Sequence, residues 1–343
     1  MATTITPLPK AEIHRHLEGS VRAATFLDIA ERHNLDVPTH DLAELKRLIQ
    51  MAPDDPKDFQ FFLSKFARYR GFYPDGESIR RVAAEAVQDA ARDNIRYLEL
   101  RYSPIHFALR KNFPLADVAV WVTESAREAA KASGMRVEFI ATLGRNFGVA
   151  AGRPVGELIA KEGPRFFRGV DLAGIEPGHP AVAFREFFEE ARRQGLGVTI
   201  HAGEACGPEN IWEAIDTLGA DRIGHGVRAA EDPALVAELA RRKIPIECCL
   251  TSNLHTGVVK RIEDHPAKKL FNAGIPVTLN TDDPAISGGI TLSGEYNLAV
   301  EKLGFTRRDI QTTLRNTVEA AFLSDAEKQM VLADTFPAEN IFR

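Results

Sequence analysis

The stretch AEIHRHLEGS, residues 11–20, contains the residues on which the fold assignment rests. We predict a β-strand over Ala11–Leu17. Side chains two positions apart point to the same face of a strand, so His14 and His16 face one way while Ile13 faces the other. Two imidazoles on one face indicate either half of a metal site or a polar strand end without chemistry. The rest of the chain must distinguish the two.

Short apolar runs alternate with helical patterns along the whole chain. The candidate strands are Ala11–Leu17, Ile95–Tyr102, Val137–Leu143, Gly169–Leu172, Gly197–Ile200, Arg222–Gly224, Pro245–Leu250 and Pro276–Asn280. Helical segments lie between most of them, for example Glu209–Leu218, in which Ile211 and Ile215 share a face. Capping boxes at Ser324 and Thr306 indicate two further helix starts.

Eight strands alternating with helices predict an α/β fold of the (β/α)8 TIM-barrel type. The segment 22–94 is too long for one crossover, so we expect extra helices after the first strand, at Phe26–His33, Leu42–Ile49, Asp58–Tyr69 and Glu77–Arg92. Residues 292–335 indicate more helices at the C-terminus. Without a linker or an internal repeat, we predict a single domain over residues 1–343.

The composition excludes several classes of partner. The chain has 343 residues and a formal net charge of −5, and its densest basic cluster, Arg241 to Lys243, is short, which argues against nucleic acid or an anionic membrane. Cys206, Cys248 and Cys249 form no C-x-x-C motif, and we expect the adjacent pair Cys248 and Cys249 to be small core residues rather than disulfides or ligands. Neither a signal peptide nor a membrane-spanning run is evident, so we expect a cytoplasmic protein.

Two later strands end in residues that could complete a metal site. His201 follows the strand in GVTIHAGE (197–204), and Asp282 follows the strand in VTLNTDDP (277–284). The carboxyl ends of barrel strands share one rim, so both side chains should lie beside His14 and His16. Three imidazoles and a carboxylate suit Zn²⁺, with a water as fifth ligand. We predict one zinc ion per chain.

Other polar residues on the same rim favour a catalytic ion. Structural zinc sites are usually closed by cysteine, which this set lacks, and zinc lowers the pKa of a bound water toward about 7. His225, in RIGHG (222–226), could orient that water and take its proton, and Glu204 could act as an acid. Asp283 precedes Pro284, which favours extended backbone and could turn its carboxylate into the mouth of the site. A satisfied core histidine at His225 and helix capping by Glu204 remain the alternatives.

Two competing metal chemistries are disfavoured. Binuclear barrel hydrolases often carry a carboxylated lysine after the fourth strand, where VDLAGIEPGHP (170–180) has none. The combination of H-x-E with P-C-x-x-C, used by cytidine-type deaminases, is absent. His255 and His265 have no identifiable partner, and we expect them in solvent-facing loops.

Together these residues resemble the adenosine/AMP deaminase family, and the bacterial adenosine deaminases most closely. The matching motifs, in the family's order, are PKAEIHRHLEGS, YLELRYSP, VDLAGIE, TIHAGEACGPENI, RIGHGV, CCLTSNLHTG and LNTDDP. The resemblance implies a zinc-dependent hydrolase that deaminates adenosine or 2′-deoxyadenosine at C6, giving inosine or 2′-deoxyinosine and ammonia.

The resemblance also implies roles by position. The residues matching the zinc ligands are His14, His16, His201 and Asp282. Glu204 matches the acid that protonates purine N1, and His225 the residue that orients and deprotonates the water. Asp283 matches the carboxylate that engages N7, and Gly174 matches a backbone N–H donor to N3. We expect His16 to touch the substrate as well.

One residue departs from the family pattern. Adenosine-specific members usually read H-x-H-L-D-G, with the aspartate reaching the ribose 5′ end, whereas this chain has Glu18, one methylene longer. The substrate therefore stays open between adenosine, a 5′-modified adenosine such as aminodeoxyfutalosine, and free adenine, although Arg15 and CLTSNLHTG disfavour adenine. A non-catalytic purine-binding protein on the same fold is a weaker alternative. In each case the partner is a small purine compound, and the oligomeric state is left open.

Overall fold

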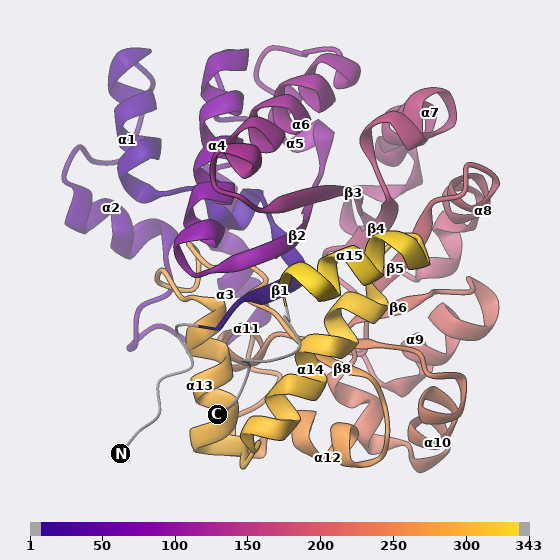
Figure 1. Ribbon diagram of the computed structural model, residues 1–343. Helices are drawn as coiled ribbons and strands as arrows, with labels where there is room; N and C mark the ends of the chain where they lie inside the picture. Colours follow the sequence, from indigo (N-terminus) through magenta and orange to yellow (C-terminus); the bar gives the residue numbers. More distant parts are fainter. Residues whose placement is uncertain (1–7, 336–343) are drawn as a thin grey trace.

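A closed barrel of eight parallel strands forms the centre of the computed structural model, which describes residues 8–335 (Figure 1). The strands pair in sequence order, and their bounds are β1 Lys10–His16, β2 Ile95–Tyr102, β3 Arg136–Gly144, β4 Gly169–Ala173, β5 Gly197–Ala202, β6 Arg222–His225, β7 Ile246–Cys248 and β8 Val277–Leu279. The bridge between Arg15 and Asp282 joins the first strand to the segment after the last. The predicted TIM-barrel class is confirmed, and each predicted strand lies within two residues of an observed one at either end.

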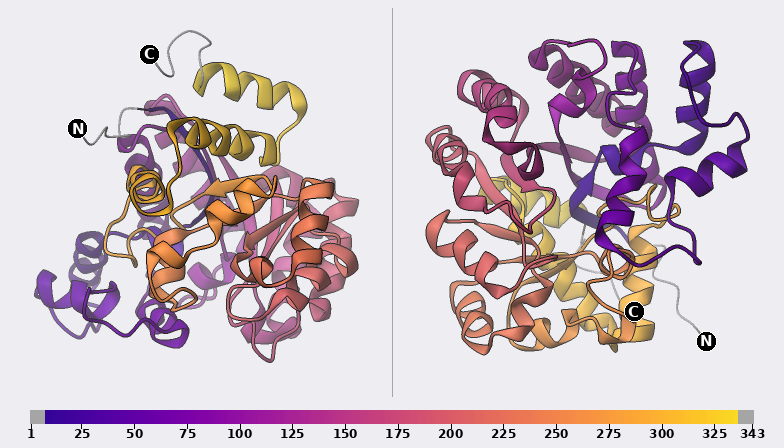
Figure 2. Two further views of the ribbon diagram at one scale, coloured as in Figure 1. Left: turned by 90° about the horizontal axis from the view of Figure 1, so that it is seen from below. Right: turned by 180° about the vertical axis from the view of Figure 1, so that it is seen from behind.

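Extra helices follow β1, as predicted, and stand to one side of the barrel (Figure 2). They are α1 Ala23–Arg32, α2 Leu42–Ile49, α3 Phe59–Ser64 with the turn Lys65–Arg68, and α4 Gly76–Arg92. Aspartates start three of them: the side chains of Asp41, Asp58 and Asp75 each accept a hydrogen bond from the backbone N–H three residues later, at 2.8–2.9 Å. Such caps satisfy donors that the first helical turn leaves free.

The remaining helices surround the barrel and close one of its two ends. Their bounds are α5 Pro104–Ala108, α6 Leu115–Ala132, α7 Gly148–Phe166, α8 Arg185–Arg193, α9 Pro208–Trp212, α10 Pro233–Arg242, α11 Leu250–His255, α12 Ala267–Asn272, α13 Leu292–Leu303, α14 Arg307–Ala320 and α15 Asp325–Thr335. The predicted helix Glu209–Leu218 is α9 followed by a π-helical turn over Glu213–Thr217. Both predicted capping boxes are present, before α14 and before α15.

Paired charges, rather than aliphatic layers, fill the barrel interior. Arg222 donates a hydrogen bond to Glu99 at 2.7 Å and forms an ion pair with Glu247, also at 2.7 Å. Arg101 donates to Glu247 at 2.9 Å, and all four side chains are buried. Phe322, between α14 and α15, covers this network: its ring lies 3.7 Å from the Arg222 guanidinium, and its backbone N–H bonds Glu99. The network connects the closed end of the barrel to the rim that carries the site.

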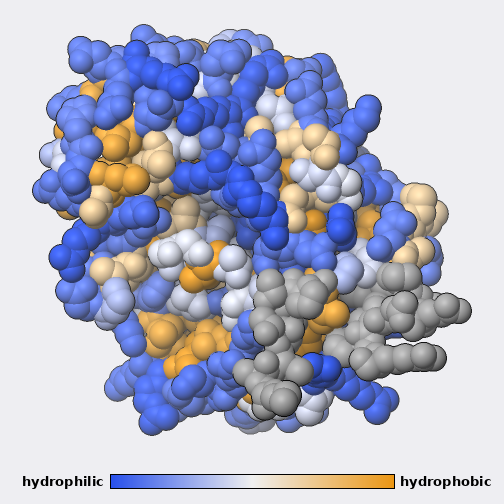
Figure 3. Space-filling view, turned by 60° about the vertical axis from the view of Figure 1, so that its left-hand side comes forward, coloured by the Kyte–Doolittle hydropathy of each residue, from blue (hydrophilic) through white to orange (hydrophobic). Residues whose placement is uncertain are grey.

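The outer face in Figure 3 is largely hydrophilic, with apolar side chains in separate small groups. Within residues 8–335 no helix is both long and apolar enough to cross a membrane. Cys248 and Cys249 are buried, as the sequence predicts, and Cys206 is half-buried. The assignment of residues 1–343 to one domain stays a prediction, since both ends lie outside the described residues.

Candidate active site

The four predicted metal ligands converge at the carboxyl rim of the barrel. One nitrogen from each of His14, His16 and His201 and one oxygen of Asp282 lie within 4.8 Å of one another. Asp282 Oδ1 is 3.1 Å from His14 Nε2 and 3.4 Å from His16 Nε2. His201 is the penultimate residue of β5, so it reaches the rim from within the strand rather than after it.

Two buried carboxylates orient these imidazoles. Glu247 of β7 lies 2.7 Å from His14 Nδ1, and Asp171 of β4 lies 2.9 Å from His201 Nδ1. A carboxylate on Nδ1 holds the proton there and leaves the Nε2 lone pair aimed at the centre of the cluster. Sequence analysis missed both residues; a carboxylate in the middle of an apolar strand was the available signal.

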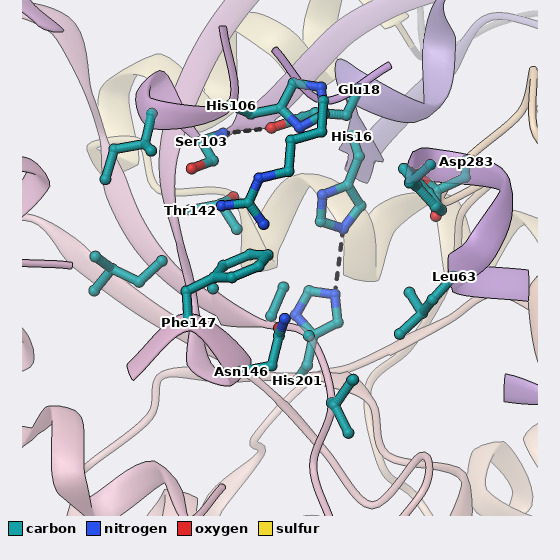
Figure 4. Close-up of a pocket in the computed structure, with 18 of the residues that line it drawn as sticks. His16, Glu18, Leu63, Ser103, His106, Thr142, Asn146, Phe147, His201 and Asp283 are labelled. Carbon is teal, nitrogen blue, oxygen red and sulfur yellow. Dashed lines mark hydrogen bonds between the residues drawn. The ribbon is translucent and has the colours of Figure 1, made fainter. Parts of the chain in front are cut away.

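The lone pairs of the four ligand atoms are arranged to bind a cation. His16 Nε2 and His201 Nε2 are 3.3 Å apart, as the dashed line in Figure 4 shows, and His201 already carries its proton on Nδ1. A proton on His16 Nε2 could also account for this short separation. Burial, however, lowers the pKa of His16 well below its usual value, which disfavours the protonated ring. Ser252 Oγ donates to Asp282 Oδ2 at 2.7 Å, leaving Oδ1 toward the histidines. An ion bound among these lone pairs satisfies all of them.

A buried acid and a buried imidazole face each other beside this cluster. Glu204 Oε2 lies 3.4 Å from His225 Nε2. Burial, followed by the negative charges of Asp282 and Glu176, raises the pKa of Glu204 well above its usual value. Burial lowers the pKa of His225 well below its usual value, and neighbouring imidazoles add to the effect. Both shifts favour the uncharged form, a carboxylic acid at Glu204 and a free imidazole at His225.

Asn253, which sequence analysis missed, connects the two groups. Its amide nitrogen lies 3.1 Å from Glu204 Oε1 and 3.1 Å from His225 Nδ1. Its amide oxygen is 3.2 Å from Nε2 of His265, whose Nδ1 accepts a bond from the Ala267 N–H. The prediction of a solvent-facing His265 is wrong, because the ring is buried here, and burial lowers its pKa to about 3. His255 is half-buried, with Nδ1 3.4 Å from Ser287 Oγ, so its prediction fails as well.

Asp283 lines the pocket (Figure 4). Gly19 leaves room for its carboxyl group. A Cβ at Gly19 would lie 1.9 Å from Asp283 Oδ1, so any side chain there would displace the carboxyl group. That oxygen is buried without a hydrogen-bond partner. Burial, then the charge of Asp282, raises the pKa of Asp283 well above its usual value, while Asp282, among the imidazoles, stays ionised.

The loop after β4 brings Gly174 to the pocket as predicted. Its φ of +100° lies in a region that favours glycine, and a Cβ there would lie 2.2 Å from Asn146 Oδ1. The same loop buries Glu176, which was not predicted to have a role. Glu176 accepts hydrogen bonds from the turn that bears Glu204.

Glu18 also lines the pocket. Its Oε1 accepts a 2.6 Å bond from the Ser103 N–H, shown dashed in Figure 4, whereas Oε2 is buried without a partner. Burial raises its pKa to about 7. His106 and Arg70 line the pocket as well.

The cavity that joins these groups has a volume of about 400 Å³. Its apolar lining includes Phe62 of α3, Phe66 of the turn Lys65–Arg68 and Val155 of α7. Its polar lining includes His16, Glu18, His201, Glu204, His225, Asp282 and Asp283. A few convergent polar groups in an apolar cavity are typical of a small-molecule site.

Comparisons with known proteins identify the family of the chain. Residues 9–336 match the family profile described as adenosine deaminase. A curated adenosine deaminase of Serratia proteamaculans is 42% identical over 324 residues, which is 94% of this chain and 96% of that protein.

Three solved structures share the fold. An adenine deaminase from Arthrobacter aurescens superimposes with a TM-score of 0.87 at 27% identity, covering 96% of this chain and 98% of that one. An amidohydrolase from Burkholderia ambifaria with bound Zn gives 0.87 at 26%, covering 96% and 90%. An Arabidopsis ADAL complexed with IMP gives 0.82 at 25%, covering 96% and 97%.

Proposed function

This chain belongs to the adenosine deaminase family, and we propose that it is a zinc enzyme that hydrolyses adenosine and 2′-deoxyadenosine to the corresponding inosine and ammonia. The observation that carries the proposal is the buried pair Glu204 and His225, 3.4 Å apart, beside three imidazoles and the Asp282 carboxylate. The directions of their pKa shifts favour a carboxylic acid at Glu204 and a free imidazole at His225. Protonation of a purine nitrogen requires an acid that stays protonated at neutral pH. Burial favours that form of Glu204, because it raises the pKa of the carboxyl group well above its usual value.

We assign His14, His16, His201 and Asp282 as the residues that hold the ion. Zinc bound there would lower the pKa of a water to about 7 and so supply the nucleophile. The proposal of zinc over other divalent ions follows from the nitrogen-rich donor set.

Glu204 is the proposed donor to purine N1. Asn253 and Thr256 both donate to its Oε1, at 3.1 and 3.2 Å, so the carboxylic proton belongs on Oε2. Transfer of that proton to N1 makes C6 more electrophilic when water adds. The amino group then leaves as ammonia.

His225 is the proposed group that orients the attacking water. Because Asn253 donates to Nδ1, the proton of the neutral ring belongs on Nε2, which would then donate to the oxygen of the attacking water. Removal of the water proton by this ring, which the family resemblance implies, requires the other tautomer and stays a prediction.

Asp283 and Gly174 are the proposed contacts to the purine ring. Purine N7 is an acceptor, so its partner must donate, and the raised pKa of Asp283 favours the carboxylic acid that can do so. The unpartnered Oδ1 of Asp283 is available for this contact. The backbone N–H of Gly174 would donate to N3.

An ammonia-release assay on adenosine, 2′-deoxyadenosine, adenine, AMP and aminodeoxyfutalosine tests the proposal directly. We expect the two unmodified nucleosides to have the highest kcat/KM. No ammonia from any compound would indicate a binding protein, and a higher kcat/KM for adenine would assign the chain to the base-specific branch.

One observation favours a 5′-modified nucleoside as the second candidate. The Arg70 guanidinium lies 3.4 Å from the centre of the Phe147 ring, both groups line the pocket, and Arg70 forms no ion pair with any described carboxylate. Nε2 of the neighbouring His106 is buried without a partner. A guanidinium free in a pocket suits a carboxylate or phosphate, so the AMP and aminodeoxyfutalosine arms of the panel test this candidate.

Substitution of Glu18 by aspartate is expected to raise the ratio of kcat/KM for adenosine to that for adenine by about fivefold, which corresponds to about one hydrogen bond, or 1 kcal/mol. The shorter side chain draws back from the ribose end and frees space for the sugar. Parallel assays of Glu128→Asp, an exposed residue of α6, provide the control. A ratio unchanged in Glu18→Asp would show that this residue does not control access of the ribose.

A further inference from the structure

Glu176 accepts hydrogen bonds from four consecutive backbone N–H groups. Its Oε1 accepts from Gly203 at 2.9 Å, and its Oε2 accepts from Glu204, Ala205 and Cys206 at 3.0, 2.6 and 3.0 Å. The Asn210 side-chain amide adds a longer bond of 3.4 Å to Oε1. Helix α9 begins only at Pro208, so these donors belong to an irregular turn that has no helical partners of its own.

The side chain acts only as an acceptor. It is 3% exposed, and no basic side chain within residues 8–335 lies at ion-pair distance from it. An ionised carboxylate offers about four acceptor positions and no donor, which matches a run of N–H groups. Glutamine has the same shape, but its NH₂ group would face some of those N–H donors. Its substitution therefore removes the match without creating a cavity.

The contact joins two loops that meet the substrate from different strands. Glu176 lies two residues after Gly174, on the loop that follows β4. Glu204 lies on the turn that follows β5. Glu176 itself does not line the pocket. Its contacts fix the backbone at Glu204, the proposed donor to N1, relative to the loop that carries Gly174, the proposed donor to N3.

We propose that Glu176 is a positioning residue. It acts on the reaction by fixing the position of the Glu204 carboxyl group relative to the Gly174 loop. The inference rests on the proposed role of Glu204 as the acid. A displacement of about 1 Å at a reacting group can lower a rate about a hundredfold, so loss of these bonds should appear in kcat.

A double-mutant cycle separates positioning from general support of the fold. We expect Glu176→Gln to lower kcat for adenosine by about 10- to 100-fold when Glu204 is present. In the Glu204→Gln background, Glu176→Gln should lower the residual rate by less than about twofold. The reason is that residue 204, which Glu176 positions, can no longer donate a proton there. The residual rates are measured as inosine formed at high enzyme concentration, together with bound metal and circular dichroism.

The matched control is Asp93→Asn, a buried carboxylate that also accepts from a backbone N–H, that of Ser293 at 2.9 Å. Asp93 pairs with Lys10 at the start of β1, at the opposite end of the barrel. Its substitution should change kcat by the same small factor in both backgrounds.

Equal losses from Glu176→Gln in both backgrounds, or no loss in either, would overturn the positioning role while leaving the assignment of Glu204 intact. If Glu204→Gln alone keeps its activity, the proposed acid and the positioning role both fail. Should Glu176→Gln not fold, the same cycle with Glu176→Asp applies, because the shortened carboxylate cannot span all four donors.

Discussion

Replacement of Glu204 by glutamine is expected to lower kcat for adenosine by about 10²- to 10⁴-fold, the usual contribution of a positioned general acid. Glutamine keeps the shape of the side chain and the bond from Asn253, but it has no proton to give to N1. The measurement is the rate of ammonia release at saturating adenosine.

The same variant should keep its metal, because Glu204 is not among the four converging ligands. Bound zinc per chain, measured by atomic emission, should match that of the wild type. Glu209→Gln, an exposed residue five positions further on, makes the same chemical change outside the pocket and should leave kcat unchanged. Turnover near the wild-type rate in Glu204→Gln would contradict the assignment of the acid.

The barrel could be predicted from sequence because its signals are local. Short apolar runs marked the eight strands, and the spacing of His14 and His16 on one of them showed which way their rings point. The rule that parallel strand ends share a rim then brought His201 and Asp282 to the same place. Each of these inferences needs only one segment and its strand direction.

The residues that support the site could not be found in this way, because their partners lie on distant strands. Glu247 contacts His14 across 233 positions of sequence, and Asn253 meets Glu204 across 49. His265 was misassigned although its partner is only twelve residues away, because no periodic pattern in the sequence places a loop histidine against the amide of Asn253 on α11. Only the closed barrel reveals these pairs.

Backbone conformation at the rim is a second property that sequence did not reveal. His225 and Asp282 both have φ of +61°, a region that non-glycine residues seldom occupy. Such conformations persist where the surrounding structure holds them, and they concentrate at functional sites. At Asp282, two backbone hydrogen bonds to β1 stabilise this conformation. The Asp282 N–H donates to the carbonyl of His14, and the Asp282 carbonyl accepts from the His16 N–H. The closure of the barrel thus sets the direction of a proposed ligand.

Replacement of His14 by alanine is expected to lower zinc affinity by more than about a hundredfold, since changes in groups that merely orient a ligand already cost 10- to 100-fold. His14 is fully buried, and its Nε2 lies 3.1 Å from Asp282 Oδ1 in the ligand cluster, so its loss removes one of the four donors. Competition against a chelator of known affinity measures the change. Ammonia release from adenosine should fall with the loss of the ion.

Thermal unfolding gives an independent measure that does not depend on turnover. A ligand that binds only the folded state stabilises it by RT ln(1 + [L]/Kd), about 2.7 kcal/mol at a hundredfold excess over Kd. Addition of a chelator should therefore lower the Tm of the wild type and leave that of His14→Ala unchanged. His40→Ala, whose ring is 65% exposed near Glu31, should respond to the chelator as the wild type does. Full zinc stoichiometry and a chelator-sensitive Tm in His14→Ala would exclude His14 from the ligand set.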